Sequence, residues 1–420
     1  MALIVQKFGG TSVADAERIR KVARRLCAAR EAGNDVVAVV SAMGDVTDEL
    51  LALARQVSQS PPEREMDMLL ATGEQVTIAL LAMAIHSSGH EAISLTGPQA
   101  GILSDASHTK ARIQEVRADR VREALAEGRI VIVAGFQAIS DEGEITTLGR
   151  GGSDTTAVAI ASRIEADVCE IYTDVDGVYT ADPRVVPTAR KIDVVSYEEM
   201  LEMAASGARV LQLRSVEFAR NHGVVIHVRS SFNDEPGTVV EEAQPGMEQA
   251  IISGVTHDTS EAKITIRDLP DRPGVAAEVF GTLAEHNVNV DMIIQNVSEG
   301  GRSDISFTTP EEDLARARRA VAEVVEELGA REWSVDESIA KVSLVGAGMK
   351  THPGVAAGMF RALADAGVNL DMISTSAIRI SCVIDSADVE KAVRALHAHF
   401  GLDASAVTAE VSPGCGGGEE

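Results

Sequence analysis

Two segments near the C-terminal end of the chain are near copies of one another. PGVAAEVFGTLAEHNVNVDMI begins at Pro273, and PGVAAGMFRALADAGVNLDMI begins at Pro353, 80 residues further on. The two 21-residue segments share 13 identical positions without a gap. Self-similarity of this degree at a fixed interval is the signature of repeated structural modules. We therefore expect the C-terminal part of the chain to be a tandem pair of small domains.

Each copy shows the same order of expected elements. A strand, a Pro-Gly turn and a helix lead into the V-N-[VL]-D-M-I strand, and one more strand and one more helix follow. This βαββα pattern is typical of ferredoxin-like modules. The expected elements outside the duplicated segments are 262–269, 303–309 and 311–328 in the first copy, and 340–347, 378–384 and 388–400 in the second.

The first 230 residues alternate apolar β-type runs with helical patterns. Such alternation predicts βαβ units and a mainly parallel sheet between helices, which binds ligands beyond the carboxyl ends of its strands. The expected strands are 2–8, 35–42, 91–97, 129–136, 167–175 and 224–230, and the expected helices are 16–33, 48–57, 65–89 and 119–128.

A stretch rich in Pro, Gly, Asn and acidic residues, 230–249, indicates the boundary between the two parts of the chain. We expect an α/β domain over 1–245, the two small modules over 246–335 and 336–411, and a flexible tail over 412–420.

Composition limits the classes of partner. The 420 residues carry a formal charge of −26, which argues against sequence-independent nucleic-acid binding, because that requires clustered cations. No apolar run reaches the roughly 20 residues of a membrane span, and the N-terminus shows no basic region or cleavage site of a secretory signal. The four cysteines are scattered, without C-x-x-C pairing, and are expected to be reduced and mostly buried. These features predict a cytoplasmic protein without a membrane partner.

One loop between an expected strand and an Ala-rich helix has the composition of an anion site. In TLGRGGSDTTAVAIA (147–161), Gly151 and Gly152 let the backbone approach a ligand closely. Ser153 and Asp154 can cap a helix whose free N–H groups attract negative charge. The preceding Arg adds a planar fork suited to a carboxylate or a phosphate. A plain strand-to-helix turn is the alternative for this loop taken alone.

The N-terminal stretch QKFGGTS (6–12) has the same design. An expected strand ends in Lys7 and Phe8, and Gly9 and Gly10 precede a helix, so that Lys7 brings a point charge to a place where phosphoryl oxygens can gather. Two such turns in one α/β domain favour anion binding over a solvated lysine at a strand end. No G-x-x-x-x-G-K-[ST] and no G-x-G-x-x-G occurs, so neither a P-loop nor a dinucleotide fingerprint accounts for these turns.

Five motifs resemble, in order, those of the aspartate kinases of the amino acid kinase family, and the duplicated part resembles the ACT domains that follow that catalytic domain. The motifs are KFGGTS (7–12), VVSAMGDVTDEL (39–50), LLATGEQ (69–75), TTLGRGGSDTTA (146–157) and YTDVDGVYTADPR (172–184). The resemblance covers nearly the whole chain. It implies the amino acid kinase fold followed by two βαββα ACT domains.

The resemblance implies transfer of the γ-phosphoryl group of ATP to the side-chain carboxylate of aspartate. The product, 4-phospho-aspartate, leads toward lysine (through diaminopimelate), threonine and methionine. A carboxylate is already ionised at neutral pH, so no general base is needed, and positioning and charge stabilisation carry the transfer. Mg²⁺ is expected to enter with ATP, held largely by phosphates. YTDVDGVYTADPR lacks the Glu that a calcium loop needs at its twelfth position, and we expect no protein-held metal.

The resemblance also implies roles for single residues. The catalytic residues are expected to be Lys7, which stabilises the transferring phosphoryl group, Arg150, which binds the α-carboxylate of aspartate, and Asp154, which contacts the substrate or orients Lys7. The implied substrate-binding residues are Ser41, Thr47, Glu74, Arg150, Gly151, Gly152, Ser153 and Asp154. The implied nucleotide-binding residues are Lys7, Phe8, Gly9, Gly10, Thr173, Asp174, Tyr179, Asp182, Arg184 and Arg209.

Two of these roles have alternatives. Glu74 is expected to meet the ammonium group of aspartate, and a solvated helix carboxylate is the alternative. Many relatives carry a lysine in place of Arg209, and because an arginine keeps the charge but not the compact geometry, the role of Arg209 stays open.

The ACT repeats resemble amino-acid sensors, with lysine and threonine as the expected feedback effectors. The implied effector contacts are Asp271, Ala276, Asn289, Asp291 and Gln295 in the first copy, and Val355, Ala356, Asn369, Leu370 and Ser376 in the second. Two packing modules without a ligand are the alternative. Assembly through the ACT domains is expected, and Met247 is a candidate start for a shorter, separate regulatory chain.

Two other functions stay open. The first is another acid-activating kinase of the same fold, such as one acting on glutamate; the spelling TTLGRGGSD and the ACT pair favour aspartate. The second is a non-catalytic amino-acid sensor, for which degraded glycine turns or a missing Lys7 would be expected, whereas both features are intact.

Overall fold

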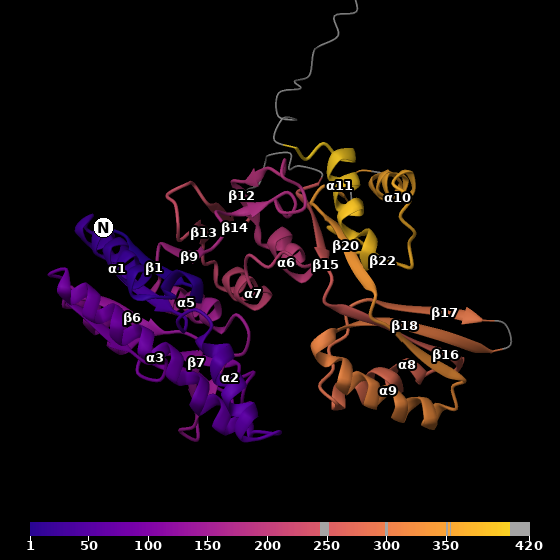
Figure 1. Cartoon of the computed structure of the whole chain (residues 1–420), viewed down its shortest axis with the longest axis horizontal. Coiled ribbons are helices and arrows are strands. Elements are labelled where there is room, and N and C mark those ends of the chain that lie inside the picture. Colours follow the sequence, from indigo (N-terminus) through magenta and orange to yellow (C-terminus); the bar gives the residue numbers. More distant parts are fainter. Residues whose placement is uncertain (244–251, 299–300, 350–351, 353, 404–420) are drawn as a thin grey trace, which may run out of the picture. The chain divides into compact units, whose positions relative to one another are not determined.

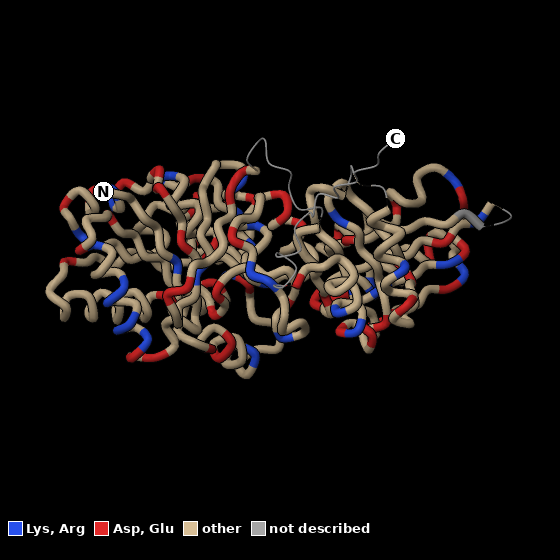
Figure 2. The backbone as a smooth tube through the Cα atoms, turned by 90° about the horizontal axis from the view of Figure 1, so that it is seen from above, with Lys and Arg blue, Asp and Glu red and all other residues tan. Residues whose placement is uncertain are grey.

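The computed structural model describes residues 1–243, 252–298, 301–349, 352 and 354–403, which form two compact units (Figure 1). The N-terminal unit comprises Met1–Val178, Lys191–Ala204 and Arg209–Met247, and the C-terminal unit comprises Tyr179–Arg190, Ala205–Ala208 and Glu248–Glu420. Acidic and basic residues are interspersed along both units (Figure 2). The expected tail over 412–420, the candidate start at Met247 and the expected border at residue 245 lie outside the described residues.

A mainly parallel sheet of eight strands forms the centre of the N-terminal unit, as the alternating pattern predicts. Its order is β12-β14-β13-β9-β1-β2-β6-β3, and β14 runs antiparallel to β13. The strands are β1 (Leu3–Phe8), β2 (Asp35–Val40), β3 (Ala92–Leu95), β6 (Ile130–Ala134), β9 (Val168–Thr173), β12 (Val194–Ser196), β13 (Ile226–Ser230) and β14 (Thr238–Glu241). The inner strands are buried on both faces, which explains their continuous apolar runs.

Helices cover both faces of this sheet. α1 (Ala16–Glu31) and α3 (Glu63–Ser87) pack on one face, and α5 (Gly152–Ile164) and α4 (Asp119–Ala126) pack on the other. A second sheet, in the order β5-β4-β7-β8, was not expected from the sequence. The further elements are η1 (Gly10–Val13), α2 (Val46–Val57), β4 (Ile102–Ser104), β5 (Ile113–Val116), β7 (Gln137–Ser140), β8 (Ile145–Thr147), α6 (Tyr197–Ala205) and α7 (Leu213–His222), with β10 (Val178–Tyr179) paired to β11 (Lys191–Ile192).

The helix α3 is long and apolar enough to cross a membrane by length and composition alone, a feature that the sequence analysis overlooked. Half of its most apolar 18-residue stretch is buried inside the protein. Its sheet-facing side includes the buried carboxylates of Asp67 and Glu74, which bond to neighbouring segments. These contacts are those of a core helix.

The C-terminal unit contains the two expected modules, each with an antiparallel sheet of four strands. The first sheet has the order β17-β18-β16-β19, and the second has the order β15-β20-β22-β21. The elements of the first module are β16 (Glu261–Pro270), α8 (Val275–Glu285), β17 (Ile293–Ser298), β18 (Arg302–Pro310), η2 (Glu311–Asp313), α9 (Leu314–Leu328) and β19 (Glu332–Asp336). Those of the second are β20 (Ile339–Val345), α10 (Val355–Asp365), β21 (Met372–Thr375), β22 (Arg379–Asp385), η4 (Ser386–Asp388) and α11 (Val389–His399).

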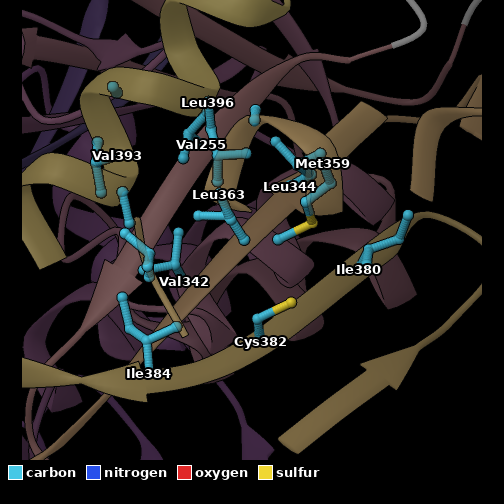
Figure 3. Packing of buried hydrophobic residues seen from close by; sticks show 14 of the residues in the cluster. Val255, Val342, Leu344, Met359, Leu363, Ile380, Cys382, Ile384, Val393 and Leu396 are labelled. Carbon is cyan, nitrogen blue, oxygen red and sulfur yellow. The ribbon is translucent and has the colours of Figure 1, made fainter. Parts of the chain in front are cut away.

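The fourth strand of the second sheet comes from an unexpected place in the sequence. β15 (Gly254–Asp258) precedes the first module, yet it pairs antiparallel with β20. Gly254 lies opposite Val345 at one end of this pairing, and Asp258 lies opposite Lys341 at the other. Its Val255 lies in the core of the second module, with Val342, Leu344 and Leu396 (Figure 3). The expected segment 246–335 therefore does not coincide with the first sheet, because β15 completes the second one.

A segment expected in the N-terminal domain also belongs to the second module. Ala181, Val185 and Val186 are buried in the core of that module. Thr180 Oγ1 lies 2.9 Å from His397 Nε2, and Arg394 Nε donates to the carbonyl oxygen of Val185 at 2.9 Å. Burial of these apolar side chains explains why Tyr179–Arg190 groups with the C-terminal unit rather than with the rest of 1–245.

Ion pairs at equivalent positions of the duplication join the two modules. Lys341 of the second module pairs with Asp291 of the first at 2.5 Å, and also with Glu261. Lys263 of the first module pairs with Asp371 of the second. Lys341 is buried, and although burial by itself lowers the pKa of its ammonium group, the carboxylates of Glu261 and Asp291 raise that pKa above its ordinary value.

We expect Lys341→Met to lower the unfolding free energy of the C-terminal unit by about 3–5 kcal/mol, because it leaves the buried carboxylate of Glu261 without its cation and Asp291 with Arg379 at 3.9 Å. Denaturant unfolding measures this change. Adding Glu261→Gln and Asp291→Asn should restore much of the loss, whereas Lys263→Met, at the more exposed equivalent pair, should cost roughly 1 kcal/mol or less. Equal losses at the two lysines would contradict the buried ion-pair account.

Candidate active site

The candidate site lies at the carboxyl ends of the central strands of the eight-stranded sheet. Lys7 is the next-to-last residue of β1, and Ser41 directly follows β2. Gly135 follows β6, and Thr173 ends β9. In a parallel sheet these strand ends meet at one edge, where ligands of such folds bind.

Lys7 and Asp154 form an ion pair at this edge. The Lys7 Nζ lies 2.6 Å from Asp154 Oδ1, and the two side chains are 12% and 8% exposed. Asp154 is placed there by the first turn of α5, which packs on the Lys7 face of β1. The carboxylate therefore holds the ammonium group at the strand end.

The N-terminal glycine turn touches the loop that follows β2. The Gly44 N–H donates to the carbonyl oxygen of Gly10 at 3.0 Å, and a Cβ on Gly10 would lie 3.0 Å from the carbonyl oxygen of Ala42. The neighbouring Gly9 would place a Cβ 3.5 Å from Lys7 Nζ. A side chain at Gly9 would therefore fill space beside the ammonium group, whereas one at Gly10 would press on the loop after β2.

Glu74 of α3 presents a half-satisfied carboxylate. Its Oε1 accepts the Ala42 N–H at 3.2 Å, whereas Oε2 is buried and has no hydrogen-bond partner among the described residues. Burial raises the pKa of this carboxyl group to about 7. An unmatched buried acceptor calls for a donor, and a cationic ligand would both satisfy Oε2 and favour the ionised form. This environment argues against the solvated carboxylate that was the alternative.

The second glycine turn leads from β8 into α5. Gly149 and Gly151 have φ values of 76° and 70°, in the left-handed region that glycine adopts without strain. The Gly152 N–H donates to the carbonyl oxygen of Gly149 at 2.9 Å. A Cβ on Gly135 would lie 2.7 Å from Ser153 Oγ, so this further glycine makes room for Ser153.

We expect Gly151→Ala to impair activity strongly, because a Cβ at this position would lie 2.0 Å from Gln212 Cγ, besides the strain of the positive φ. Gly143→Ala is the matched control, since Gly143 has φ +83° and nothing lies within 4 Å of the added Cβ. The control should lose only about 1 kcal/mol of stability and keep its turnover. Steady-state kinetics and thermal unfolding of both variants measure the difference, and similar kinetics would contradict a steric role for Gly151.

The expected nucleotide-binding residues are divided between the two units. Thr173 and Asp174 lie at the end of β9 in the N-terminal unit, where Thr173 Oγ1 lies 3.0 Å from Asp174 Oδ1. Tyr179, Asp182 and Arg184 belong to the C-terminal unit, where Arg184 Nη2 pairs with Asp182 Oδ2 at 2.7 Å. The remaining residues are Lys7, Phe8, Gly9 and Gly10, on and after β1, and the exposed Arg209, all in the N-terminal unit.

The other expected substrate residues lie on loops and at helix starts that follow strands. Ser41 and Thr47 are half-buried on the loop after β2 and at the start of α2, and Arg150 is exposed between the two glycines of the second turn. Among the described residues no three His, Cys, Asp or Glu side chains gather as a metal cage.

Several of the expected effector residues form hydrogen bonds or ion pairs within the two modules. Asp291 binds Lys341, Gln295 Nε2 lies 3.4 Å from Ser303 Oγ, and the Asn289 N–H donates to Asp313 at 3.0 Å. Ser376 accepts a bond from the backbone of the following turn. The rest are Asp271, before α8, Ala276, on α8, and Val355, Ala356, Asn369 and Leu370, on and after α10.

Sequence reasoning missed several polar residues that hold the second glycine turn. Arg214 of α7 donates from both terminal nitrogens, to the carbonyl oxygens of Leu148 and Ala111, each at 2.9 Å. Asp67 of α3 binds Thr147, the last residue of β8. Nothing in their local sequence points to these contacts, since the partners lie 66 to 103 residues away.

Three described cysteines, Cys27, Cys169 and Cys382, are free and buried, as expected. Burial raises the pKa of each thiol above its ordinary value, which keeps the thiols neutral. The fourth cysteine lies outside the described residues.

Comparison with known proteins identifies the family of the chain. The amino acid kinase family matches residues 2–230, and ACT domains match residues 264–326 and 342–400. The chain is 59% identical to the aspartokinase of Mycolicibacterium smegmatis, over 96% of this chain and 97% of that protein.

Two crystal structures of Escherichia coli aspartokinase III, each 26% identical to this chain, share its fold. The R-state complex with aspartate and ADP has a TM-score of 0.82, covering 94% of this chain and 99% of that one. The T-state complex with lysine and aspartate has a TM-score of 0.73, covering 95% and 99%.

Proposed function

The chain belongs to the amino acid kinase family, as an aspartate kinase with two ACT domains, and we propose from this premise that it transfers the γ-phosphoryl group of ATP to the side-chain carboxylate of L-aspartate. The product is 4-phospho-L-aspartate, which leads to lysine, through diaminopimelate, and to threonine and methionine in the cytoplasm. The observation that carries the proposal is the Lys7–Asp154 ion pair at the carboxyl end of β1. The unmatched Oε2 of Glu74, whose Oε1 accepts the Ala42 N–H in the loop after β2, adds to it.

The charged residues of the site have different roles in the transfer. The acceptor carboxylate of aspartate is ionised at neutral pH, so the reaction needs two anions held in line rather than a base. Lys7, aligned by Asp154, neutralises charge that gathers on the transferring phosphoryl group. Because acidic residues are spread over both units, this local cation has to overcome an unfavourable general field (Figure 2).

Recognition of aspartate uses groups of both signs. The Glu74 carboxylate binds the substrate ammonium group, and its unmatched Oε2 supports this role. Arg150 binds the α-carboxylate, and Ser41, Thr47 and Ser153 complete the pocket with the backbone of Gly151 and Gly152.

The nucleotide binds beside Lys7, with the backbone N–H groups of Gly9 and Gly10 as phosphate donors and Phe8, Thr173 and Asp174 nearby. Tyr179, Asp182, Arg184 and Arg209 remain candidates for the rest of that site. We propose that Mg²⁺ enters with ATP and is held largely by phosphate oxygens.

Lysine and threonine are the proposed feedback effectors of the ACT modules. The fold similarity to a T-state complex with lysine supports lysine. An inhibitor of this kind must bind the inactive arrangement more tightly than the active one. The proposed contacts are Asp271, Ala276, Asn289, Asp291 and Gln295, and Val355, Ala356, Asn369, Leu370 and Ser376. We also propose assembly through the ACT domains, with Met247 as a start for a shorter regulatory chain, which N-terminal sequencing of natively expressed protein tests.

An ADP-release assay tests the catalytic proposal. Turnover should depend on aspartate and should be far slower with glutamate at the same concentration. Titration with lysine and threonine, separately and together, then tests the regulation. A higher rate with glutamate would support the glutamate-type kinase, and binding of either effector without any ADP release would support the non-catalytic sensor.

A further inference from the structure

The buried side of α3 carries two carboxylates two helical turns apart, and their surroundings differ. Glu74 has one unmatched oxygen, which suits a ligand-binding group. Asp67 has no exposed surface, and donors reach both of its oxygens. Thr147 Oγ1 donates to Oδ1 at 2.5 Å, His108 Nδ1 lies 2.7 Å from Oδ2, and the Thr109 N–H lies 3.1 Å from each oxygen. A carboxylate satisfied in this way acts on the protein rather than on a ligand.

The donors to Asp67 belong to two segments that meet the second glycine turn. Thr147 ends β8, three residues before Arg150. Thr109 has φ +64°, and its carbonyl oxygen would lie 3.0 Å from a Cβ on Gly149. The Ala111 N–H donates to the carbonyl oxygen of Thr147 at 2.9 Å, which ties the two segments together. One carboxylate thus holds both sides of the turn that carries Arg150.

Arg214 holds the same two segments from the α7 side. Its Nη1 and Nη2 donate to the carbonyl oxygens of Leu148 and Ala111. Asp67 therefore works within a frame in which α3 and α7 each bind the 108–111 segment and the end of β8. Thr109 is held in a backbone conformation that non-glycine residues rarely adopt, and the two hydrogen bonds of its N–H to Asp67 offset part of that cost.

We propose that Asp67 is a positioning residue for the acceptor substrate, which sets the place of Arg150 through Thr147 and the 108–111 segment. The inference rests on the proposed role of Arg150 as the group that binds the α-carboxylate of aspartate. Displacement of a binding group by a fraction of an ångström weakens a bidentate contact and misaligns the acceptor oxygen. The effect should therefore fall on aspartate rather than on ATP.

The test is Asp67→Asn, which keeps the shape of the side chain but replaces one acceptor by a donor facing other donors. We expect the KM for aspartate to rise about tenfold or more, with the KM for ATP within about twofold of wild type. Thr147→Val removes only the hydroxyl that binds Asp67, and should raise the same constant by a smaller factor. Arg150→Lys combined with Asp67→Asn should raise it by less than the product of the single effects, because both changes weaken one contact.

Glu199→Gln is the matched control for loss of a buried carboxylate in the same unit. The hydroxyl group of Ser196, the last residue of the edge strand β12, donates to Glu199 Oε2 at 2.6 Å. This variant should keep both KM values. The inference is overturned if Asp67→Asn leaves the KM for aspartate unchanged, raises both KM values equally, or adds independently to Arg150→Lys. If Asp67→Asn does not fold, Thr147→Val alone decides by the same criteria. Lack of aspartate-dependent turnover in the wild type would refute the proposed function instead.

Discussion

Replacing Lys7 with Met should lower kcat by at least about 10²–10³-fold, since removing one preorganised group that stabilises the developing charge has an effect of this size. Lys7 is held at 2.6 Å from Asp154 at the end of β1, where its side chain is only 12% exposed. Steady-state ADP release under saturating aspartate and ATP measures the change. Binding of amino acids to the C-terminal unit should persist.

Several variants separate the chemical role of Lys7 from its role in stability. Lys7→Met leaves a carboxylate that is 8% exposed without its cation, and should also destabilise the N-terminal unit. Adding Asp154→Asn should restore stability but not turnover. Lys21→Ala, on α1, removes an exposed lysine that pairs with Glu17 and should change neither. Turnover of Lys7→Met near that of wild type would end the assignment of Lys7.

Replacing Glu74 with Gln should raise the KM for aspartate by roughly 10–100-fold with little change in kcat. The expected partner is the substrate ammonium group, which keeps its charge throughout the reaction, so the lost interaction is equal in the ground state and the transition state. The KM for ATP should not change. Glu65→Gln on the same helix is the control, because Glu65 is exposed and pairs with Arg64. A KM for aspartate equal to that of wild type would refute the contact.

The raised pKa of Glu74 gives this site a pH dependence. Its ionised form binds the ammonium group, so kcat/KM for aspartate should be highest above the pKa of about 7 and fall about tenfold per pH unit below it. In Glu74→Gln this fall should be absent. A pH profile that is the same in both proteins would show that another group titrates.

The same shift predicts a stability effect of opposite sense. The folded-state pKa of about 7 lies above the ordinary value of 4.5, so the contribution of Glu74 to stability is fully present below 4.5 and is lost as the pH rises through 7. At pH 8, Glu74→Gln should therefore be more stable than wild type by roughly 3 kcal/mol in the absence of substrate. Aspartate should reduce this difference by binding the ionised form.

The sequence by itself determined the two-part organisation, the fold class and the family. The duplication at Pro273 and Pro353 depends only on identity between segments, and the alternation of strands and helices is a local pattern. The two glycine turns and Lys7 could also be recognised in the sequence, because the glycines and charged residues expected of an anion site are adjacent in the chain.

Only the tertiary structure decided how distant segments complete one another. β15 joins the second sheet because a strand can pair with an exposed sheet edge from any place in the chain. Ala181, Val185 and Val186 are likewise buried in the core of the second module, although they lie far from it in the sequence. The local sequence around Asp67 and Glu74 does not separate the two carboxylates. Asp67 is satisfied by Thr147, His108 and Thr109, whereas Glu74 has an unmatched oxygen. Burial and hydrogen bonding between distant segments set this difference, and no local sequence pattern encodes them.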